Sequence, residues 1–410
     1  MGERHMNAKL RKLYDMAVKE LTENLLPWWM TVAVDEENGG FYGAVDNDNK
    51  PVPHATKFIT LNARLIWTFS SAYRILGDEQ YKVMADRAYD YFIRHFWDDR
   101  YDACYTRVDE FGNPVDKHRY IYGNAFAVYG LSEYARAFDS EEARSYARRL
   151  VASLEKYDYD PVYKGYFESL REDMTHDPWI RGVNRNPSDE KTMNTHLHLI
   201  EAYTCLLRTE KTDLMQRKVR EQLYVMLNKI VDHDIHHYYY FQDRAWNPTT
   251  QEISFGHDIE GSWLMMETAE VLGEPEAMRY AQDTCMNIAR ACYEQGFRHE
   301  DGAMLSEYDP VTGHASRGLS WWEQNEAVVG FLNAWEITGD EKFLDASLKC
   351  FEFADQHFVD HEKGGWFATL TLDGSAVTSV HKQNDYTCPY HNGRMCMEII
   401  ERYRRHAAQE

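Results

Sequence analysis

Apolar residues recur at helical spacing along most of the chain, in runs of two different kinds. The run 81–92 places apolar residues on one side and charged residues on the other, which is typical of a helix with one buried face. The runs 61–69 and 259–266 are apolar nearly all round and are interrupted by an isolated polar or charged residue. Such helices are expected to be buried on every side, with their polar residues lining an internal cavity.

A short acidic turn separates one helical run from the next at five places, roughly 65 residues apart. Glycine fits the left-handed position at the end of a helix, and carboxylates stabilise the start of the following helix. Each unit is therefore predicted to be a helical hairpin followed by a loop. The turns lie at 76–81, 138–142, 208–212, 272–276 and 338–343.

The loops between these units are aromatic and rich in glycine, which predicts short β-hairpins. They lie at 39–42, 105–112, 165–167, 238–241, 304–313 and 364–374.

Twelve helices follow from this pattern, and six helical hairpins would close as an inner ring within an outer ring. We therefore predict an all-α fold, an (α/α)6 barrel with short β-hairpin loops, in which residues 1–410 form a single catalytic domain. Residues 1–7 are expected to be disordered or tag-like. An open solenoid is the alternative, although it would need polar capping repeats and more uniform copies. The helices are predicted near 8–33, 57–76, 79–97, 117–138, 140–156, 190–208, 211–233, 257–272, 275–294, 321–337, 340–358 and 389–408.

The composition argues against nucleic acids and membranes as partners. The net charge is −22, with 67 acidic against 45 basic residues and no basic stripe, so a nucleic acid is not an expected partner. No run approaches the roughly 18 apolar residues that span a bilayer, and residues 1–6 contain no apolar signal core. We expect a soluble, cytoplasmic protein without a membrane partner, as a monomer or a weak homodimer.

The cysteine and aromatic content adds two further points. The 7 cysteines include no CxxC pair, so neither a disulfide framework nor a zinc finger is predicted. The 28 Tyr and 11 Trp residues are either platforms for sugar rings or ordinary core residues.

Candidate chemical groups lie near the starts of the predicted inner helices. His257 and Glu260 are three residues apart, and Asn194 and His198 are four apart, so each pair shares a helix face. His196 points away from His198 and is interpreted as structural.

Three more candidates lie on other inner helices. Trp322 and Glu326 would set an aromatic platform beside a carboxylate, and His391 begins the last helix. Arg64 is a lone guanidinium in an apolar run, where it requires an anionic or carbonyl partner. Each group alone is compatible with a satisfied core residue, but closure of the ring would bring all of them together.

A metal centre is an alternative use of His198, His257, Glu260 and His391. Their spacing matches no dedicated metal motif, and we expect neither a metal nor another cofactor. GxGxxG, P-loop and GxSxG motifs are absent from the sequence, which argues against a nucleotide cofactor and an α/β-hydrolase.

Five of these segments together resemble the cellobiose 2-epimerases, within the larger N-acylglucosamine 2-epimerase group. The resemblance extends from about residue 8 to residue 405. It implies a metal-independent (α/α)6-barrel isomerase that interconverts gluco and manno forms of a reducing-end aldose through a cis-enediol. The segments are 61–67, 191–198, 256–260, 321–326 and 388–394.

The resemblance also implies roles for individual residues. His257 and His391 are similar to the family's two acid/bases, Arg64 to the group that holds the enediolate oxygens, and Glu260 to its helper carboxylate. The residues similar to its sugar contacts are Tyr122, Asn194, His198, Trp322 and Glu326.

Two residues depart from the family pattern. Tyr386 stands where a second stacking Trp is expected, and Asn124 stands where a Gln is expected. These departures leave open how many sugar rings are bound.

The chemistry of proton transfer agrees with these roles. Removing the C2 proton of an open-chain aldose needs a base with a pKa near neutrality and a cation for the developing enediolate. Return of the proton to the opposite face needs a second acid, which explains two histidines.

The expected substrate is a β-1,4-linked disaccharide of the cellobiose or mannobiose type. Delivery of the proton to C1 would instead give a ketose, so a mannose 2-epimerase or an aldose–ketose isomerase acting on monosaccharides remains an alternative. A glycoside hydrolase on the same barrel would use Glu260 and Glu326 about 5 to 10 Å apart. A noncatalytic sugar-binding protein would have no use for two histidines and an arginine buried with aromatics.

Overall fold

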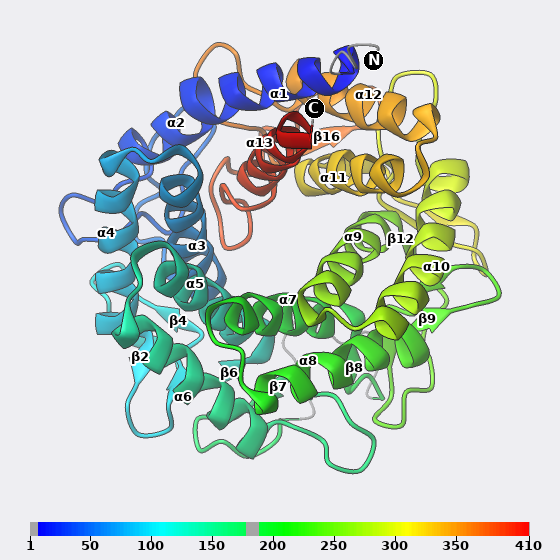
Figure 1. Ribbon diagram of the computed structural model, residues 1–410. Helices are drawn as coiled ribbons and strands as arrows, with labels where there is room; N and C mark the ends of the chain where they lie inside the picture. The colour runs from blue at the N-terminus through cyan, green and yellow to red at the C-terminus, as the bar shows by residue number, and fades with distance from the viewer. Residues whose placement is uncertain (1–6, 178–187, 410) are drawn as a thin grey trace.

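The computed structural model describes residues 7–177 and 188–409, which form two concentric rings of helices (Figure 1). Twelve helices lie in these ranges, so the predicted (α/α)6 barrel is confirmed. The inner ring consists of α3 (Ile59–Leu76), α5 (Ile121–Phe138), α7 (Met193–Thr209), α9 (Phe255–Leu272), α11 (Trp321–Thr338) and α13 (His391–Gln409). The outer ring consists of α1 (Ala8–Lys19) continued by η1 (Glu20–Leu25) and α2 (Leu26–Thr31), α4 (Glu79–Phe96), α6 (Glu141–Tyr157), α8 (Asp213–Val225) continued by η2 (Met226–Ile230), α10 (Pro275–Ala291) continued by η3 (Cys292–Gly296), and α12 (Glu341–His357).

The ring is closed by the two ends of the chain. Five inner helices pair with the outer helix that follows them, whereas α13 packs against α1, α3 and α11. Figure 1 shows α13 inside α1. Five of the six predicted hairpins are therefore consecutive in sequence, and the sixth is formed by the first and last helices.

The two kinds of hydrophobic run correspond to the two rings. The inner helices α3, α9 and α11 are buried along most of their length because the outer ring covers one side and the barrel interior the other. Outer helices such as α4 bury one face. Gly130 is required at one inner contact, since a Cβ atom there would lie 2.5 Å from the carbonyl oxygen of Ala63 on α3.

Short antiparallel strands tie neighbouring repeats together where the inner helices begin. A strand leads directly into each of five inner helices and pairs with a strand from the loop of the next repeat. These pairs are β1 (Lys57–Phe58) with β4 (Arg107–Val108), β6 (Arg119–Tyr120) with β7 (Ser169–Leu170), β8 (Lys191–Thr192) with β11 (Phe241–Gln242), β12 (Ile253–Ser254) with β13 (Glu307–Asp309), and β15 (Gly318–Ser320) with β16 (Thr369–Thr371).

Strand hairpins occur at or beside three of the six predicted loops, 105–112, 238–241 and 304–313, and a further hairpin follows α4; at 39–42, 165–167 and 364–374 the chain is folded back by isolated bridges. The strand hairpins pair β2 (Trp97–Asp98) with β3 (Ala103–Cys104), β4 with β5 (Pro114–Asp116), β9 (Val231–Asp232) with β10 (His237–Tyr238), and β13 with β14 (His314–Ala315). The helix predicted from residue 117 begins at Ile121 because Arg119 and Tyr120 belong to β6.

The beginning of the chain differs in one respect from the expectation. The segment expected to be disordered or tag-like falls outside the described residues, except for Asn7. Asn7 caps α1, since its side chain accepts a hydrogen bond from the backbone of Lys9. In the part of the chain that the structure describes, no helix has the length and apolar character needed to cross a membrane.

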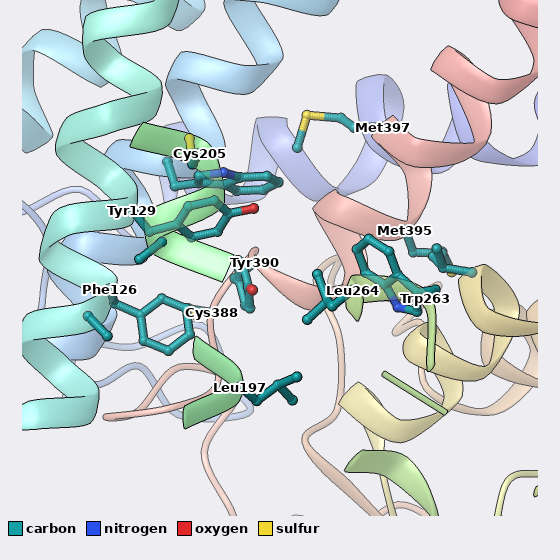
Figure 2. Packing of buried hydrophobic residues seen from close by; sticks show 14 of the residues in the cluster. Phe126, Tyr129, Leu197, Cys205, Trp263, Leu264, Cys388, Tyr390, Met395 and Met397 are labelled. Carbon is teal, nitrogen blue, oxygen red and sulfur yellow. The ribbon is translucent and has the colours of Figure 1, made fainter. Parts of the chain in front are cut away.

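The centre of the barrel is filled by side chains of the inner helices (Figure 2). Phe126 of α5 and Tyr390, which precedes α13, meet with ring centroids 5.2 Å apart. Trp263 of α9 is fully buried in the same cluster. This layer lies beneath the polar residues of the first helical turns and holds them in place.

Candidate active site

A cavity of about 410 Å³ opens where the inner helices begin, and nine of the ten predicted site residues line it. These residues lie in the first two turns of all six inner helices or directly before α13, which is why ring closure brings them together. The nine are Arg64, Tyr122, Asn194, His198, His257, Glu260, Trp322, Tyr386 and His391. Lining residues that sequence reasoning missed are Tyr120, Tyr240, Phe241, Glu252, Ser254, Glu307 and Trp321.

His391 is a buried imidazole backed by a carboxylate. Its Nδ1 atom lies 2.7 Å from Oε1 of Glu326 and 4.0 Å from Oε1 of Glu260. Burial, together with the charges of Arg64 and Arg394, holds the pKa of His391 well below its usual range. Because Nδ1 faces a carboxylate, the neutral ring carries its proton there, and Nε2 is left with a free lone pair. His391 is thus built to accept a proton at Nε2.

His257 has a different environment. Its Nδ1 atom lies 2.7 Å from the hydroxyl of Ser254, and its ring centroid lies 4.6 Å from that of Trp322. Burial lowers the pKa of His257 to about 3, below the near-neutral value expected of the base, so the ring is neutral. The same indole contacts His391, with centroids 5.6 Å apart. Trp322 therefore joins the two imidazoles, one backed by a hydroxyl and the other by a carboxylate.

Arg64 supplies a buried positive charge to the cavity. Its guanidinium donates to the hydroxyl of Tyr122, at 2.7 Å, and to the backbone carbonyl of Tyr386, at 3.1 Å. It also lies over the rings of Phe126 and Tyr390, at 4.1 and 4.6 Å. Among the described residues no carboxylate pairs with Arg64, and its Nε atom is buried without a hydrogen bond. The expected carbonyl partner is present, and the charge remains free to attract an anion.

Asn194 and His198 line the cavity from α7, as the shared helix face predicted. Nδ1 of His198 lies 2.9 Å from Oε2 of Glu201, and burial lowers the pKa of His198. Oδ1 of Asn194 is buried and has no hydrogen-bond partner in the part of the chain that the structure describes. His196 points away and anchors a loop, since its Nε2 accepts from the backbone N–H of Tyr166 at 2.9 Å.

Glu326 is placed differently from the sugar contact that the resemblance implied. It is 1% exposed and lies behind the cavity wall, where Oε2 accepts from the indole of Trp263 at 3.0 Å and Oε1 bonds His391. Both oxygens are engaged by protein groups. We therefore assign Glu326 to the support of His391, and its pairing with Trp322 as a platform beside a carboxylate is not formed.

Glu260 lines the cavity and is fully buried. Burial and the neighbouring charge of Glu326 raise its pKa well above the usual range, against the opposing charge of Arg394. Its Oε2 atom has no hydrogen-bond partner among the described residues. A protonated carboxyl group in this position can donate to a sugar oxygen.

Glu260, Glu326 and His391 offer ligand atoms within 4.8 Å of one another, which makes them a candidate metal set. The guanidinium of Arg394 donates to the Oε1 atoms of both carboxylates, at 2.5 and 2.7 Å. A cation is thus already provided by the protein at this point. The other two predicted ligands are engaged elsewhere, His198 by Glu201 and His257 by Ser254.

The contacts of Glu260 and Glu326 also argue against the glycosidase alternative. That mechanism needs two carboxyl groups on either side of a glycosidic oxygen. Glu260 and Glu326 instead share one guanidinium, and Glu326 does not face the cavity. The arrangement does not favour glycoside hydrolysis.

The two departures from the family pattern have different consequences. Asn124 is fully buried, accepts from the backbone N–H of Cys104 and donates to the carbonyl of Tyr120, both at 2.9 Å. It anchors a strand and does not touch the cavity. Tyr386 is 41% exposed at the cavity mouth, with its ring 5.4 Å from that of Phe58. Of the two departures, the one at residue 386 is therefore the one that lies at the cavity.

Comparison with known proteins shows which family the chain belongs to. The sequence profile of the N-acylglucosamine 2-epimerase (GlcNAc 2-epimerase) family matches residues 40–391. The cellobiose 2-epimerase of Bacteroides fragilis is 41% identical over 382 residues, covering 93% of this chain and 97% of that protein. The cellobiose 2-epimerase of Dictyoglomus turgidum is 35% identical over 395 residues, covering 96% and 99%.

A solved structure gives the same result. The cellobiose 2-epimerase from Bacillus thermoamylovorans superposes with a TM-score of 0.91 at 32% identity, covering 97% of this chain and all of that one. The resemblance to the cellobiose 2-epimerases is thereby confirmed. The chain belongs to the N-acylglucosamine 2-epimerase family, and it is a carbohydrate epimerase, that is, an isomerase.

Proposed function

We propose that the protein epimerises the reducing-end aldose of a β-1,4-linked disaccharide, of the cellobiose or mannobiose type, at C2. The observation that carries this proposal is the combination of two neutral imidazoles, His257 and His391, with the uncompensated guanidinium of Arg64 around one cavity. An imidazole is a suitable base for a proton next to an aldehyde, and the guanidinium favours the enediolate that results.

Both imidazoles are neutral at rest, so one of them must first take up a proton from solvent before the forward reaction begins. The neutral ring removes the C2 proton of the open-chain aldose, and Arg64 holds the enediolate oxygens while charge develops on them. The protonated ring then donates its proton to the opposite face of C2. The two rings have now exchanged protonation states, so each must exchange a proton with solvent before the same direction can proceed again.

The environments of the two imidazole rings suggest which ring acts as the base and which as the acid. Glu326 fixes the proton of the neutral His391 ring at Nδ1, which leaves Nε2 of His391 available as the base. Among the described residues the hydrogen-bond partner at Nδ1 of His257 is the hydroxyl of Ser254, so no carboxylate holds a proton on this ring. The carboxyl group of Glu260, whose pKa burial raises well above the usual range, can donate a hydrogen bond to a sugar oxygen when it is protonated.

The names of the relatives and the cavity mouth support a disaccharide. Tyr120 and Tyr386 line the mouth and offer aromatic faces to a second ring. Tyr386 provides less stacking area than the Trp expected there, so we expect the outer ring to be held more weakly. The contacts proposed for the reacting ring are unaffected.

The test is incubation with cellobiose, mannobiose, mannose and glucose in deuterated water, followed by NMR of the products. We expect the C2 epimer of a disaccharide with deuterium at C2, and a slower reaction of the monosaccharides. A higher kcat/KM for a monosaccharide than for every disaccharide would make mannose 2-epimerase the better assignment. A ketose as main product would favour the isomerase, since the same base and cation can route the proton to C1.

A further inference from the structure

Arg394 joins four inner helices through buried carboxylates. From α13 it donates to Glu260 of α9, to Glu326 of α11 and to Glu201 of α7. None of these four side chains is more than 2% exposed. Arg394 is not among the residues that line the cavity, so it reaches the substrate only through its partners.

Two of these carboxylates hold imidazoles that line the cavity. Oε1 of Glu326 accepts from both Arg394 and His391, each at 2.7 Å. Glu201 divides its oxygens, with Oε1 bound to Arg394 and Oε2 bound to His198. The ring orientations of both histidines therefore depend on carboxylates whose own positions are fixed by one guanidinium.

The charge of Arg394 also affects these groups, because it shifts the pKa values of Glu201 and His391. Burial alone would raise the pKa of Glu201, but the guanidinium and the hydrogen bond from His198 bring it below its usual range. Glu201 thus stays ionised as an acceptor. After burial and Arg64, Arg394 is the next cause of the lowered pKa of His391.

We propose that Arg394 is a positioning residue of the proton-transfer site, which holds Glu326 and Glu201 so that His391 and His198 keep Nδ1 protonated and present a free Nε2 to the sugar. This inference rests on the proposed function. A lysine could supply the charge but not the planar fork that reaches several carboxylates at once.

The titratable and charged groups around His391 come from the surrounding inner helices, and besides burial the pKa of His391 is shifted by Arg64, Arg394, His198 and Glu201. They are Arg64 of α3, Tyr122 of α5, His198 and Glu201 of α7, His257 and Glu260 of α9, Glu326 of α11, and Tyr390 and Arg394 at α13.

The first test compares Arg394→Lys with a matched control, Arg402→Lys. Arg402 lies on the same helix, is 6% exposed and binds Glu336 and Glu398, away from the cavity. We expect Arg394→Lys to lower kcat about 10- to 100-fold with KM changed less than about threefold, because the histidines lose their orientation. Arg402→Lys should stay within about twofold of the wild type. An unchanged kcat in Arg394→Lys, or an equal loss in both variants, would overturn the proposal.

The pH profile of kcat/KM separates the effect of the charge of Arg394 from the effect of its hydrogen-bond geometry. Arg394→Met removes a charge that lowers the pKa of His391, so the acid limb of kcat/KM should move to higher pH. Arg394→Lys keeps the charge, and its limb should move little although kcat falls. A limb that stays in place in folded Arg394→Met would contradict the electrostatic part of the proposal.

A third measurement uses the wild-type chain and so does not depend on whether a variant folds. Nitrogen-15 NMR of labelled histidines, with His391 assigned from the spectrum of His391→Asn, should show a neutral ring protonated at Nδ1 between pH 6 and 8. A neutral ring protonated at Nε2 would overturn the proposal. Failure of the proposed function would look different, because the wild-type protein would then exchange no C2 proton of any sugar tested.

Discussion

The carboxyl group of Glu323 gives a direct test of how burial controls the stability of this barrel. Glu323 lies in the first turn of α11, 3% exposed, and accepts from the hydroxyl of Ser306 at 2.5 Å and from the backbone of Ser320 at 3.1 Å. Burial raises its pKa to about 8, against 4.5 for an unperturbed glutamate. The folded protein therefore binds a proton at neutral pH that the unfolded chain has already released.

The sign and size of the effect follow from this difference. A folded-state pKa above the unfolded value means that the stabilisation is present below about pH 4.5 and is lost as pH rises towards 8. At about 1.4 kcal/mol per pH unit, the loss between pH 5 and 8 is at most about 4 kcal/mol. Water penetration and relaxation reduce such penalties, so we expect about 2 to 4 kcal/mol.

Glu323→Gln removes this titration while keeping the acceptor oxygen. Urea unfolding at pH 5, 6, 7 and 8 should show that the variant loses less stability than the wild type as pH rises. At pH 5 the variant should be less stable by about 1 kcal/mol, because the added amide N–H group is buried without an acceptor. The exposed Glu300→Gln serves as control and should follow the wild type. Parallel curves for the wild type and Glu323→Gln would refute the argument.

Four further outcomes are expected. His257→Asn and His391→Asn should each lower kcat by at least ~10² without changing the circular dichroism, whereas retention of most activity would show that the roles are misassigned. Full activity should survive exhaustive chelation with EDTA, and loss followed by rescue with one divalent metal would contradict this. Tyr386→Trp should raise kcat/KM for disaccharides and leave that for monosaccharides unchanged. A single-domain barrel should unfold in one cooperative transition by calorimetry, and two separate transitions would indicate two domains.

Much of the architecture could be predicted because the two rings impose different hydrophobic patterns. A helix covered on both sides must be apolar all round, so the runs 61–69 and 259–266 indicated inner helices directly. The pairing of α1 with α13 was not visible in the sequence, since these helices are joined by no loop and belong to no complete repeat. The starts of helices shifted by a few residues where a strand pair, as at Arg119 and Tyr120, takes the preceding residues.

The sequence predicted which side chains line the cavity but not the hydrogen bonds that join them across the inner helices. Spacing along a helix indicates which residues share a face, and this placed His257 with Glu260 and Asn194 with His198 correctly in the cavity. It does not indicate which carboxylate from another helix meets a given imidazole. Glu326 was thus read as a sugar contact, although Trp263 and His391 engage it from neighbouring helices.

The sequence contained a pattern from which Arg394 and Glu201 could have been predicted as part of the site. Each is a charged residue in an otherwise buried helical run, three residues after a histidine of the site. Such a charge requires a partner across the barrel, because an isolated buried ion is too costly. By contrast, Asn124 attracted attention only as a departure from a family pattern, and its contacts with Cys104 and Tyr120 show a purely structural role.

The two ends of the inner ring differ in a way that explains the chemistry at the cavity. At the far end, charges are paired within the protein, as Arg208 is with Glu267 and Arg74 with Glu133. At the cavity end, the helices present their N-termini, each equivalent to about half a positive charge, beside an Arg64 that has no carboxylate partner in the described structure. Burial is the main cause that keeps the two imidazoles neutral. The positive field interacts only weakly with an uncharged aldose, and in the proposed mechanism it acts most strongly on the enediolate, which forms only after the C2 proton has left. Stabilisation that appears only at that stage accelerates the reaction without tightening substrate binding, and this separates a proton-transfer catalyst from a sugar-binding protein built on the same barrel.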